Sequence, residues 1–208
     1  MKKLYLIFFI ISYVYLNGLT ERFDLLLTSG YTHTTMTGKS VNQYHRTGFR
    51  YTPGQGMHYG AGIIFTPQTD AFFITEGGIR YKETSYEIHR RHYYPFYRYH
   101  YRKHYYYDEL RSSYFDVYAK FKPQLKAEME IDRVLFSFYP YVGGTFSTLL
   151  ESEDSNINST NHALLFGADI VLNKKLYLGL EYSKGLNNVF KNGRAYSESF
   201  VGAVGIIF

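Results

Sequence analysis

The segment 194–208 alternates between large apolar and small side chains, and it constrains the fold more than any other part of the sequence. The large apolar residues share one parity and the small ones the other; they are, respectively, Phe200, Val204, Ile206 and Phe208, and Ser197, Ser199, Ala203 and Gly205. Successive side chains of a strand point to opposite faces, so the segment predicts a strand with one apolar face. Because it ends on the aromatic Phe208, this strand is typical of the segment that closes a transmembrane β-barrel.

Eight alternating segments of this kind fill the chain after residue 21; they lie at 22–36, 56–66, 71–88, 112–123, 133–149, 162–172, 176–189 and 195–208. Short connections follow the second, fourth and sixth, at 67–70, 124–132 and 173–175, whereas longer ones follow the first, third and fifth, at 37–55, 89–111 and 150–161. Each segment is long enough for a tilted strand to cross a bilayer, which takes about 9–11 residues. We therefore predict an all-β fold, an eight-stranded antiparallel up-and-down transmembrane β-barrel with its short turns and both termini on the periplasmic side.

The parity of the segments separates an apolar face from a charged one. The apolar face comprises Leu25, Leu27, Ile63, Phe65, Phe115, Val117, Phe121, Phe136, Phe138, Val142, Phe146, Leu164, Phe166, Ile170, Leu176, Leu178 and Leu180. The opposite face mixes glycines with charged residues, which are Asp24, Glu76, Arg80, Lys82, Asp116, Lys120, Asp169 and Glu181. Charges in a narrow interior are tolerated when they are paired, so acids and bases in near-equal number predict an ion-pair network that fills the lumen. A small ion or proton pathway and carboxylate-based catalysis are the alternatives for these residues.

The direction in which the two faces point is the main ambiguity. A secreted lipocalin-like barrel would turn the apolar face inward around a ligand. The charged face, however, is rich in Gly, whereas a water-facing surface usually carries long or β-branched polar residues. Small residues among charges suit the crowded interior of an eight-stranded barrel, so we expect the apolar face to lie against lipid.

The N-terminus has the organisation of a secretory signal peptide. Lys2 and Lys3 precede the apolar run 4–16, which is followed by small or polar residues. The run is too short for a helix to cross about 30 Å of hydrocarbon comfortably. We predict a signal peptide at 1–20 and an outer-membrane β-barrel domain at 21–208; an uncleaved anchor or a buried helix is the alternative.

The composition agrees with an envelope location. Tyr is the commonest residue, with 24 of 208, and side chains with one dry and one wet end suit membrane interfaces. The chain has no Cys, which excludes disulfides and Cys-based metal sites. Removal of Lys2 and Lys3 lowers the formal charge from +5 to +3, a small excess that does not predict nucleic-acid binding.

The connection 88–111 is dense in Tyr, His and Arg, and its residues alternate with the period of a strand. We predict that the third and fourth strands continue beyond the others as a protruding hairpin. Tyr and Arg dominate binding hot spots, which favours a partner-docking or adhesive surface. Arg also binds phosphate with bidentate hydrogen bonds, which favours a contact with lipopolysaccharide. A functionally silent loop is the third hypothesis. The candidate contact residues are Arg90, Arg91, Tyr97, Arg98, Tyr99, Tyr101 and Arg102.

Metal and catalytic signals are weak throughout the sequence. His100 and His104 lie four residues apart and share one side of a strand, but neighbouring Arg and Lys residues oppose a cation. No Gly-x-Ser-x-Gly, His-Glu-x-x-His or phosphate-binding Gly-rich motif is present. We therefore expect neither a cofactor nor an enzymatic activity.

Three segments resemble the PorT-like and OmpA-like families of outer-membrane barrels. These are 178–189 together with the closing strand to Phe208, the run Pro140-Tyr-Val-Gly-Gly144, and 115–121 followed by Lys122. The resemblance implies an eight-stranded barrel that the outer-membrane assembly machinery inserts after reading the terminal aromatic Phe208. It also implies contact with outer-membrane lipid and lipopolysaccharide, with an accessory role in a secretion or surface complex.

The sequence thus predicts a small barrel in the outer membrane of a Gram-negative bacterium, with a plugged lumen. We expect it to act through its outward loops in envelope assembly, in adhesion or beside another envelope protein. A narrow channel or transport accessory is the first alternative, and the secreted lipocalin-like ligand-binding barrel is the second.

Overall fold

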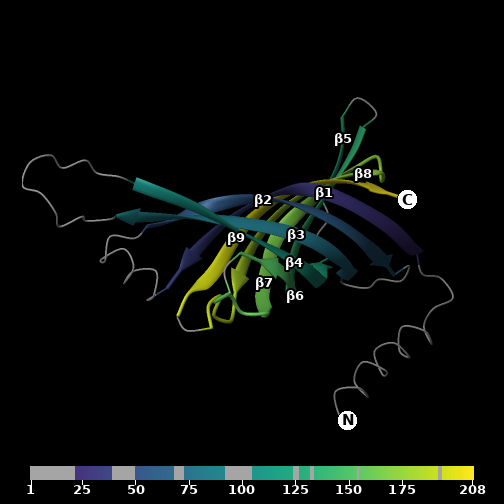
Figure 1. Ribbon diagram of the computed structural model, residues 1–208. Coiled ribbons are helices and arrows are strands. Elements are labelled where there is room, and N and C mark those ends of the chain that lie inside the picture. The colour runs from purple at the N-terminus through teal and green to yellow at the C-terminus, as the bar shows by residue number, and fades with distance from the viewer. Residues whose placement is uncertain are drawn as a thin grey trace, which may run out of the picture.

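The computed structural model describes residues 22–38, 50–67, 73–91, 105–123, 127–131, 134–153, 155–191 and 194–208, and it is all β (Figure 1). The strands are β1 Arg22–Thr37, β2 Arg50–Thr66, β3 Phe73–Arg91, β4 Tyr105–Pro123, β5 Ala127–Ile131, β6 Val134–Ser152, β7 Thr160–Leu172, β8 Leu176–Gly185 and β9 Tyr196–Ile207. The described part of the chain holds no helix with the length and apolarity for a membrane crossing. The expected signal peptide at 1–20 lies outside the described residues.

Eight of these strands close into one antiparallel barrel. Consecutive strands pair in order, β4 pairs with β6, and the first strand pairs with the last over Leu26↔Ile207 to Thr37↔Tyr196. The predicted eight-stranded up-and-down barrel and its closing strand are confirmed. Arg22 pairs with Thr66 and Leu25 bonds to Phe208, so β1 begins and β9 ends at the barrel end that carries the short turns.

The ninth strand, β5, corrects the expected connection 124–132. Ala127–Ile131 forms a hairpin with the first residues of β6, from Ala127↔Phe138 to Ile131↔Val134. It lies beyond β4, whose own pairing with β6 begins at Val142. Ala127, Met129 and Ile131 alternate with two glutamates, which is a strand pattern, but five residues are too few for this period to predict a strand with certainty from the sequence.

The loop end of the barrel extends further than the segments predicted. The β3–β4 ladder continues to Arg91↔Tyr105, and this hairpin projects past the other strands, as the prediction for the third connection required (Figure 1). In contrast, β8 ends at Gly185 rather than near 189, because the following residues turn inward: the amide of Leu186 bonds to the carbonyl of His162 and Phe190 bridges to Ile157.

The apolar face lies outside and the charged face lies inside. Leu180 is 69% exposed, whereas Glu76 is 2% exposed. The same separation holds for the apolar set as a whole, and Leu25, Val117, Val142 and Phe200 are each close to half exposed or more. The lipocalin-like alternative, which needs these side chains to line a cavity, is wrong.

Glycines on the inner face make room for tyrosine rings. A Cβ on Gly62 would lie 2.5 Å from the hydroxyl of Tyr118, and one on Gly167 would lie 2.5 Å from the hydroxyl of Tyr141. Both tyrosines are buried, and they pack with Leu165 in the middle of the barrel. The small residues of the inner face therefore leave room in the lumen for large side chains from other strands.

Candidate functional site

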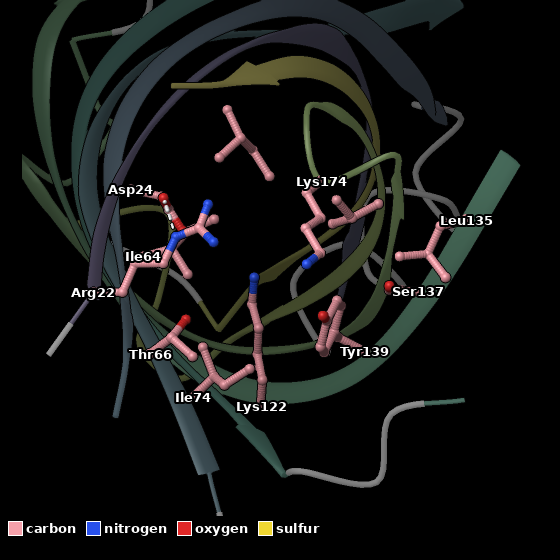
Figure 2. Close-up of a pocket in the computed structure, with 12 residues that line it drawn as sticks. Arg22, Asp24, Ile64, Thr66, Ile74, Lys122, Leu135, Ser137, Tyr139 and Lys174 are labelled. Carbon is pink, nitrogen blue, oxygen red and sulfur yellow. Dashed lines mark hydrogen bonds and ion pairs between the residues drawn. The ribbon is translucent and has the colours of Figure 1, made fainter. Parts of the chain in front are cut away.

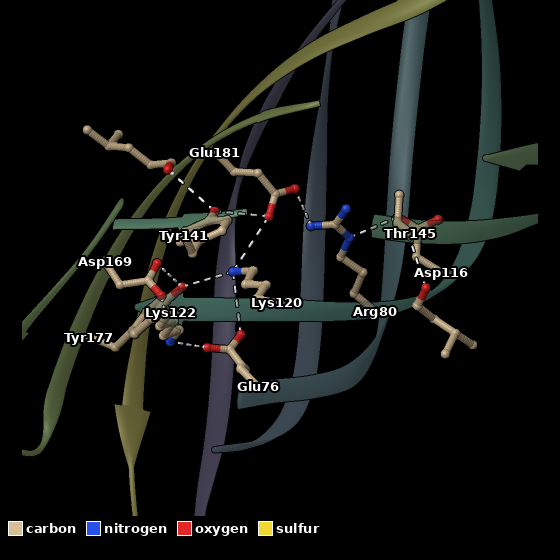
Figure 3. A network of polar contacts seen from close by, with 12 residues as sticks. Glu76, Arg80, Asp116, Lys120, Lys122, Tyr141, Thr145, Asp169, Tyr177 and Glu181 are labelled. Carbon is tan, nitrogen blue, oxygen red and sulfur yellow. Dashed lines mark hydrogen bonds and ion pairs between the residues drawn. The ribbon is translucent and has the colours of Figure 1, made fainter. Parts of the chain in front are cut away.

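The centre of the barrel holds a network of ion pairs built from strands on opposite walls (Figure 3). Arg80 of β3 donates from Nε to Asp116 of the adjacent β4 at 2.8 Å, and from Nη1 to Glu181 of β8 at 2.7 Å. β3 and β8 are not neighbours in the sheet, so the second bond spans the lumen. All three side chains are buried, and the guanidinium therefore ties the two walls together without access to bulk water.

Two lysines of β4 continue the network toward the turn end. Lys120 lies 3.4 Å from Glu76 and 3.6 Å from Glu181, measured from Nζ to the carboxylate oxygen. Lys122 contacts the same Glu76 and lies 2.7 Å from Asp169 of β7. Each carboxylate of the network faces at least one cation, which offsets the free-energy cost of burying both charges.

Two tyrosines complete the network. Tyr177 donates to Asp169 at 2.6 Å, and Tyr141 donates to Glu181 at 3.2 Å. The ring of Tyr141 has its centroid 4.4 Å from Nζ of Lys120, within cation–π distance. Tyrosines therefore supply both hydrogen bonds and ring faces to charges that water would otherwise solvate.

Buried apolar clusters lie on both sides of the charged layer. The turn-end cluster consists of Leu26, Ile64, Ile74, Val171, Tyr177 and Ile207, and the loop-end cluster of Met36, Tyr86, Ile157, Val189, Phe190 and Ala195. Between them, the cavity beside Arg80 and Glu181 has a volume of about 20 Å³, enough for about one water molecule. The charged layer is thus packed and closed at both ends by apolar side chains.

The loop-end cluster is assembled by two connections that interlock. Ile157, between β6 and β7, pairs with Phe190, between β8 and β9. The side-chain amide of Asn158 donates to the carbonyls of Asn188 and Phe190, at 2.7 and 3.3 Å. We call the described residues of these connections, 155–159, 186–191 and 194–195, the loop cap; it lies over the lumen at the end opposite the short turns.

Six of the eight charged residues singled out from the sequence meet in the network, and two lie apart from it. Asp24 accepts from Arg22 at 2.8 Å at the turn end, and the ammonium of Lys82 contacts the hydroxyl of Ser199 at 3.3 Å. Lys122, which the parity of the strand also places in the lumen beside Lys120, joins the network as well. His58, 3% exposed on the same inner face, was missed, because one His in a strand carries no distinctive pattern.

The loop candidates fall largely outside the described residues. Tyr97, Arg98, Tyr99, Tyr101 and Arg102 lie there, as do the metal candidates His100 and His104. Arg90 and Arg91 are described by their backbone, which pairs with Tyr106 and Tyr105. Within the described ranges, no three His, Asp or Glu residues are grouped as a metal ion would require.

The outer wall carries an uncharged belt, which we define as the outward-facing residues of 23–31, 57–65, 73–81, 113–121, 138–150, 164–172, 176–182 and 200–208. Aromatic pairs lie at its two edges, with ring centroids 5.2 Å apart for Phe23 and Phe65 at the turn end and 5.0 Å apart for Tyr182 and Phe200 at the loop end. Outward-facing charges begin beyond the loop-end edge, at residues such as Glu83 and Lys184.

Comparisons with known proteins give similarity in structure and none in sequence family. No family model and no curated protein matches the chain. Among solved structures, the chain is similar to Ail, the attachment invasion locus protein of Yersinia pestis, in a crystal structure with the heparin analogue sucrose octasulfate. The sequence identity is 10%, the match covers 90% of this chain and 99% of that chain, and the TM-score is 0.39.

Two further structures give similar figures. Neisserial surface protein A has 9% identity, with 88% of this chain and 97% of that chain covered and a TM-score of 0.44. The outer membrane protein OprG of Pseudomonas aeruginosa has 10% identity, with 91% and 97% covered and a TM-score of 0.41.

Proposed function

We propose that the protein is an integral outer-membrane β-barrel with a plugged lumen, which acts as a rigid anchor for its loop end in envelope assembly, adhesion or a surface complex. The observation that carries this proposal is the combination of an uncharged apolar belt outside with paired charges inside. A barrel built for water would expose its ionic face instead. The belt spans about the 9–11 residues per strand that a bilayer needs, and aromatic residues at its edges suit the lipid–water interface.

Three layers of packing support a closed lumen. A solute would have to pass the loop cap, the ion pairs of Arg80 and Lys120, and the turn-end apolar cluster. The buried carboxylates are 6% exposed or less, so no substrate reaches them in this arrangement, and the proposal contains no catalytic role.

Planar-bilayer recording tests the plugged lumen. We expect the purified protein, inserted into a bilayer, to give no stepwise currents under conditions in which a porin control conducts. Large and regular current steps from the protein would overturn the plugged-lumen proposal and would support the narrow-channel alternative.

The protruding hairpin is the proposed contact surface for lipopolysaccharide phosphates or an envelope protein. Its backbone ladder reaches Arg91↔Tyr105, and the chain that joins these residues contains the Tyr, Arg and His alternation. A rigid barrel below would hold such a segment away from the membrane surface. The proposed outer-membrane assembly signal is Phe208, whose side chain is 67% exposed at the edge of the belt.

Deletion of 93–106 tests this role, with replacement of 93–104 by a Gly/Ser linker of equal length as the matched control for loop length. In gels, both variants should still migrate differently when unheated than when heated, as a folded barrel does, since the belt and the network are intact. Both should lose capture of envelope material and surface adhesion. If both retain capture and adhesion at the level of the unmodified protein, the loop hypothesis is wrong.

A further inference from the structure

A pocket of about 330 Å³ lies at the turn end of the barrel, where it borders the charged network at Lys122 (Figure 2). Its lining comes from strand ends all around the barrel: Arg22, Asp24, Ile64, Thr66, Ile74, Lys122, Leu135, Ser137, Tyr139, Val171, Lys174 and Ile207. Pockets of this size, mostly apolar with a few convergent polar groups, are typical of small-molecule sites. Neither the ion-pair plug nor the loop cap explains it.

Three cationic side chains point toward the middle of this pocket. Arg22, Lys122 and Lys174 come from β1, β4 and the β7–β8 turn, and Figure 2 shows their nitrogen atoms directed inward from different sides. Asp24 is the one carboxylate among the lining residues, and it is bonded to Arg22. The lining therefore carries an excess of positive charge.

Lys122 supplies a buried donor at the floor of the pocket. Its side chain is 3% exposed, and its ammonium, which has three N–H donors, donates to Glu76 and lies 2.7 Å from Asp169 as an ion pair. Nζ also contributes to the pocket, where Figure 2 shows it pointing inward. The third donor is thus available to an acceptor in the pocket.

The walls around these cations are apolar. Ile64, Ile74, Val171 and Ile207 are 7–8% exposed and belong to the turn-end cluster, and the ring of Tyr139 packs against it. A purely inorganic anion would leave these walls in contact with water, whereas a ligand with an apolar tail would cover them. Hydroxyls of Thr66 and Ser137 add neutral hydrogen-bonding groups to the lining.

We propose that this turn-end pocket binds an amphipathic organic anion, with a carboxylate among the ends of Arg22, Lys122 and Lys174 and a short aliphatic or aryl tail against the isoleucines. The opening lies at the end where β1 begins and β9 ends, opposite the protruding hairpin. The site does not involve the loop contact surface. It shares Lys122 and the turn-end cluster with the plug, but a ligand would bind from the turn end without passing through the lumen, so binding is tested separately from the proposed function.

Calorimetric titration of 4-phenylbutyrate into the protein in nanodiscs of zwitterionic lipid tests the site, with 4-phenylbutanol as the uncharged probe and empty nanodiscs as the blank. We expect saturable 1:1 binding of the carboxylate and none of the alcohol. Lys174→Gln should weaken binding roughly tenfold, the change expected from losing a hydrogen bond to a charged group. Lys175→Gln is the matched control, because the neighbouring lysine does not line the pocket.

Asp24→Asn gives an effect of the opposite sign. It removes the carboxylate that occupies Arg22, so binding of 4-phenylbutyrate should tighten. The proposal is overturned if the carboxylate does not saturate the protein at millimolar concentration, if the alcohol binds equally well, or if Lys174→Gln and Lys175→Gln have the same affinity. Migration in unheated gels shows whether each variant is folded, and the Asp24→Asn variant tests the site independently if Lys174→Gln misfolds.

Discussion

At the scale of single residues, the barrel interior depends on a few shared partners. Arg80 forms ion pairs with Asp116 and Glu181 on different strands, and Glu76 forms ion pairs with two lysines. Removing one of these shared members therefore weakens the pairing of more than one buried charge. A network of this kind specifies how the walls approach each other, even where its net contribution to the free energy of unfolding is small.

We expect Arg80→Met to lower the free energy of unfolding by about 3–5 kcal/mol, because the buried Asp116 loses its ion-pair partner and the buried Glu181 is left with Lys120 at 3.6 Å. Denaturant titration in lipid vesicles measures this change. Lys82→Met is the matched control, since its ammonium contacts the neutral Ser199, and it should cost less. Replacing Arg80, Asp116 and Glu181 together with apolar residues should recover much of the loss. Equal costs for Arg80→Met and Lys82→Met would contradict the assignment.

At the scale of elements, strands and connections contribute different things. The strands place the belt and the network by alternation alone, whereas the loop cap is made by residues that follow no period. Its members meet because the connections between β6 and β7 and between β8 and β9 fold over the same barrel mouth. The cap therefore links elements that are distant in the sequence.

Ile157→Ala should loosen the loop cap while leaving the barrel closed. Ile157 is 2% exposed, and truncation of a buried Ile costs about 2–5 kcal/mol. The amide of Asn158 donates across the cap to the carbonyl of Val189, and the amide of Val189 donates to the carbonyl of Ala195. Hydrogen exchange at both amides should accelerate, whereas exchange at the amides of β8 should not. Leu186→Ala is the control, because the side chain of Leu186 is 56% exposed, and it should change the exchange rate neither of the cap amides nor of the β8 amides. Unchanged exchange in Ile157→Ala would show that the cap does not depend on this contact.

At the scale of the whole molecule, the closed barrel wall has an apolar outer face and an ionic inner face, and this arrangement determines which surroundings suit the protein. The belt continues around every strand of the barrel. Outward-facing charged residues such as Glu83 and Lys184 begin beyond its loop-end edge. Closure between β1 and β9 pairs the first and last strands from Leu26 to Thr37, and such pairing suits a lipid environment because lipid offers no hydrogen bonds to free backbone groups.

Val117→Arg places a charge in the middle of the belt on β4 and should destabilise the lipid-inserted barrel by about 2–4 kcal/mol. Ser113→Arg on the same strand, close to the loop-end edge, should cost about 0–1 kcal/mol. Unfolding from phospholipid vesicles gives both values. A Val117→Arg cost no greater than that of Ser113→Arg would mean that the belt does not contact hydrocarbon.

Much of this architecture was predictable because a strand shows alternate residues to opposite faces. That period alone determined the strand number of the barrel, the outward Leu and Phe rows and the inward charges. It could not identify the partners of each charge, since parity places Lys120 and Lys122 on one face without saying that both contact Glu76. It also missed β5, which is too short to show many repeats of the period.

The sequence by itself determined the two faces of the wall and their separation into lipid-compatible and ionic surfaces, because alternation is a local property of the chain. Only the tertiary structure decided that Arg80 crosses to Glu181, that Ile157 meets Phe190, and that Arg22, Lys122 and Lys174 surround one pocket. These contacts depend on the register and the closure of the barrel, which bring residues from different strands to the same height in the lumen.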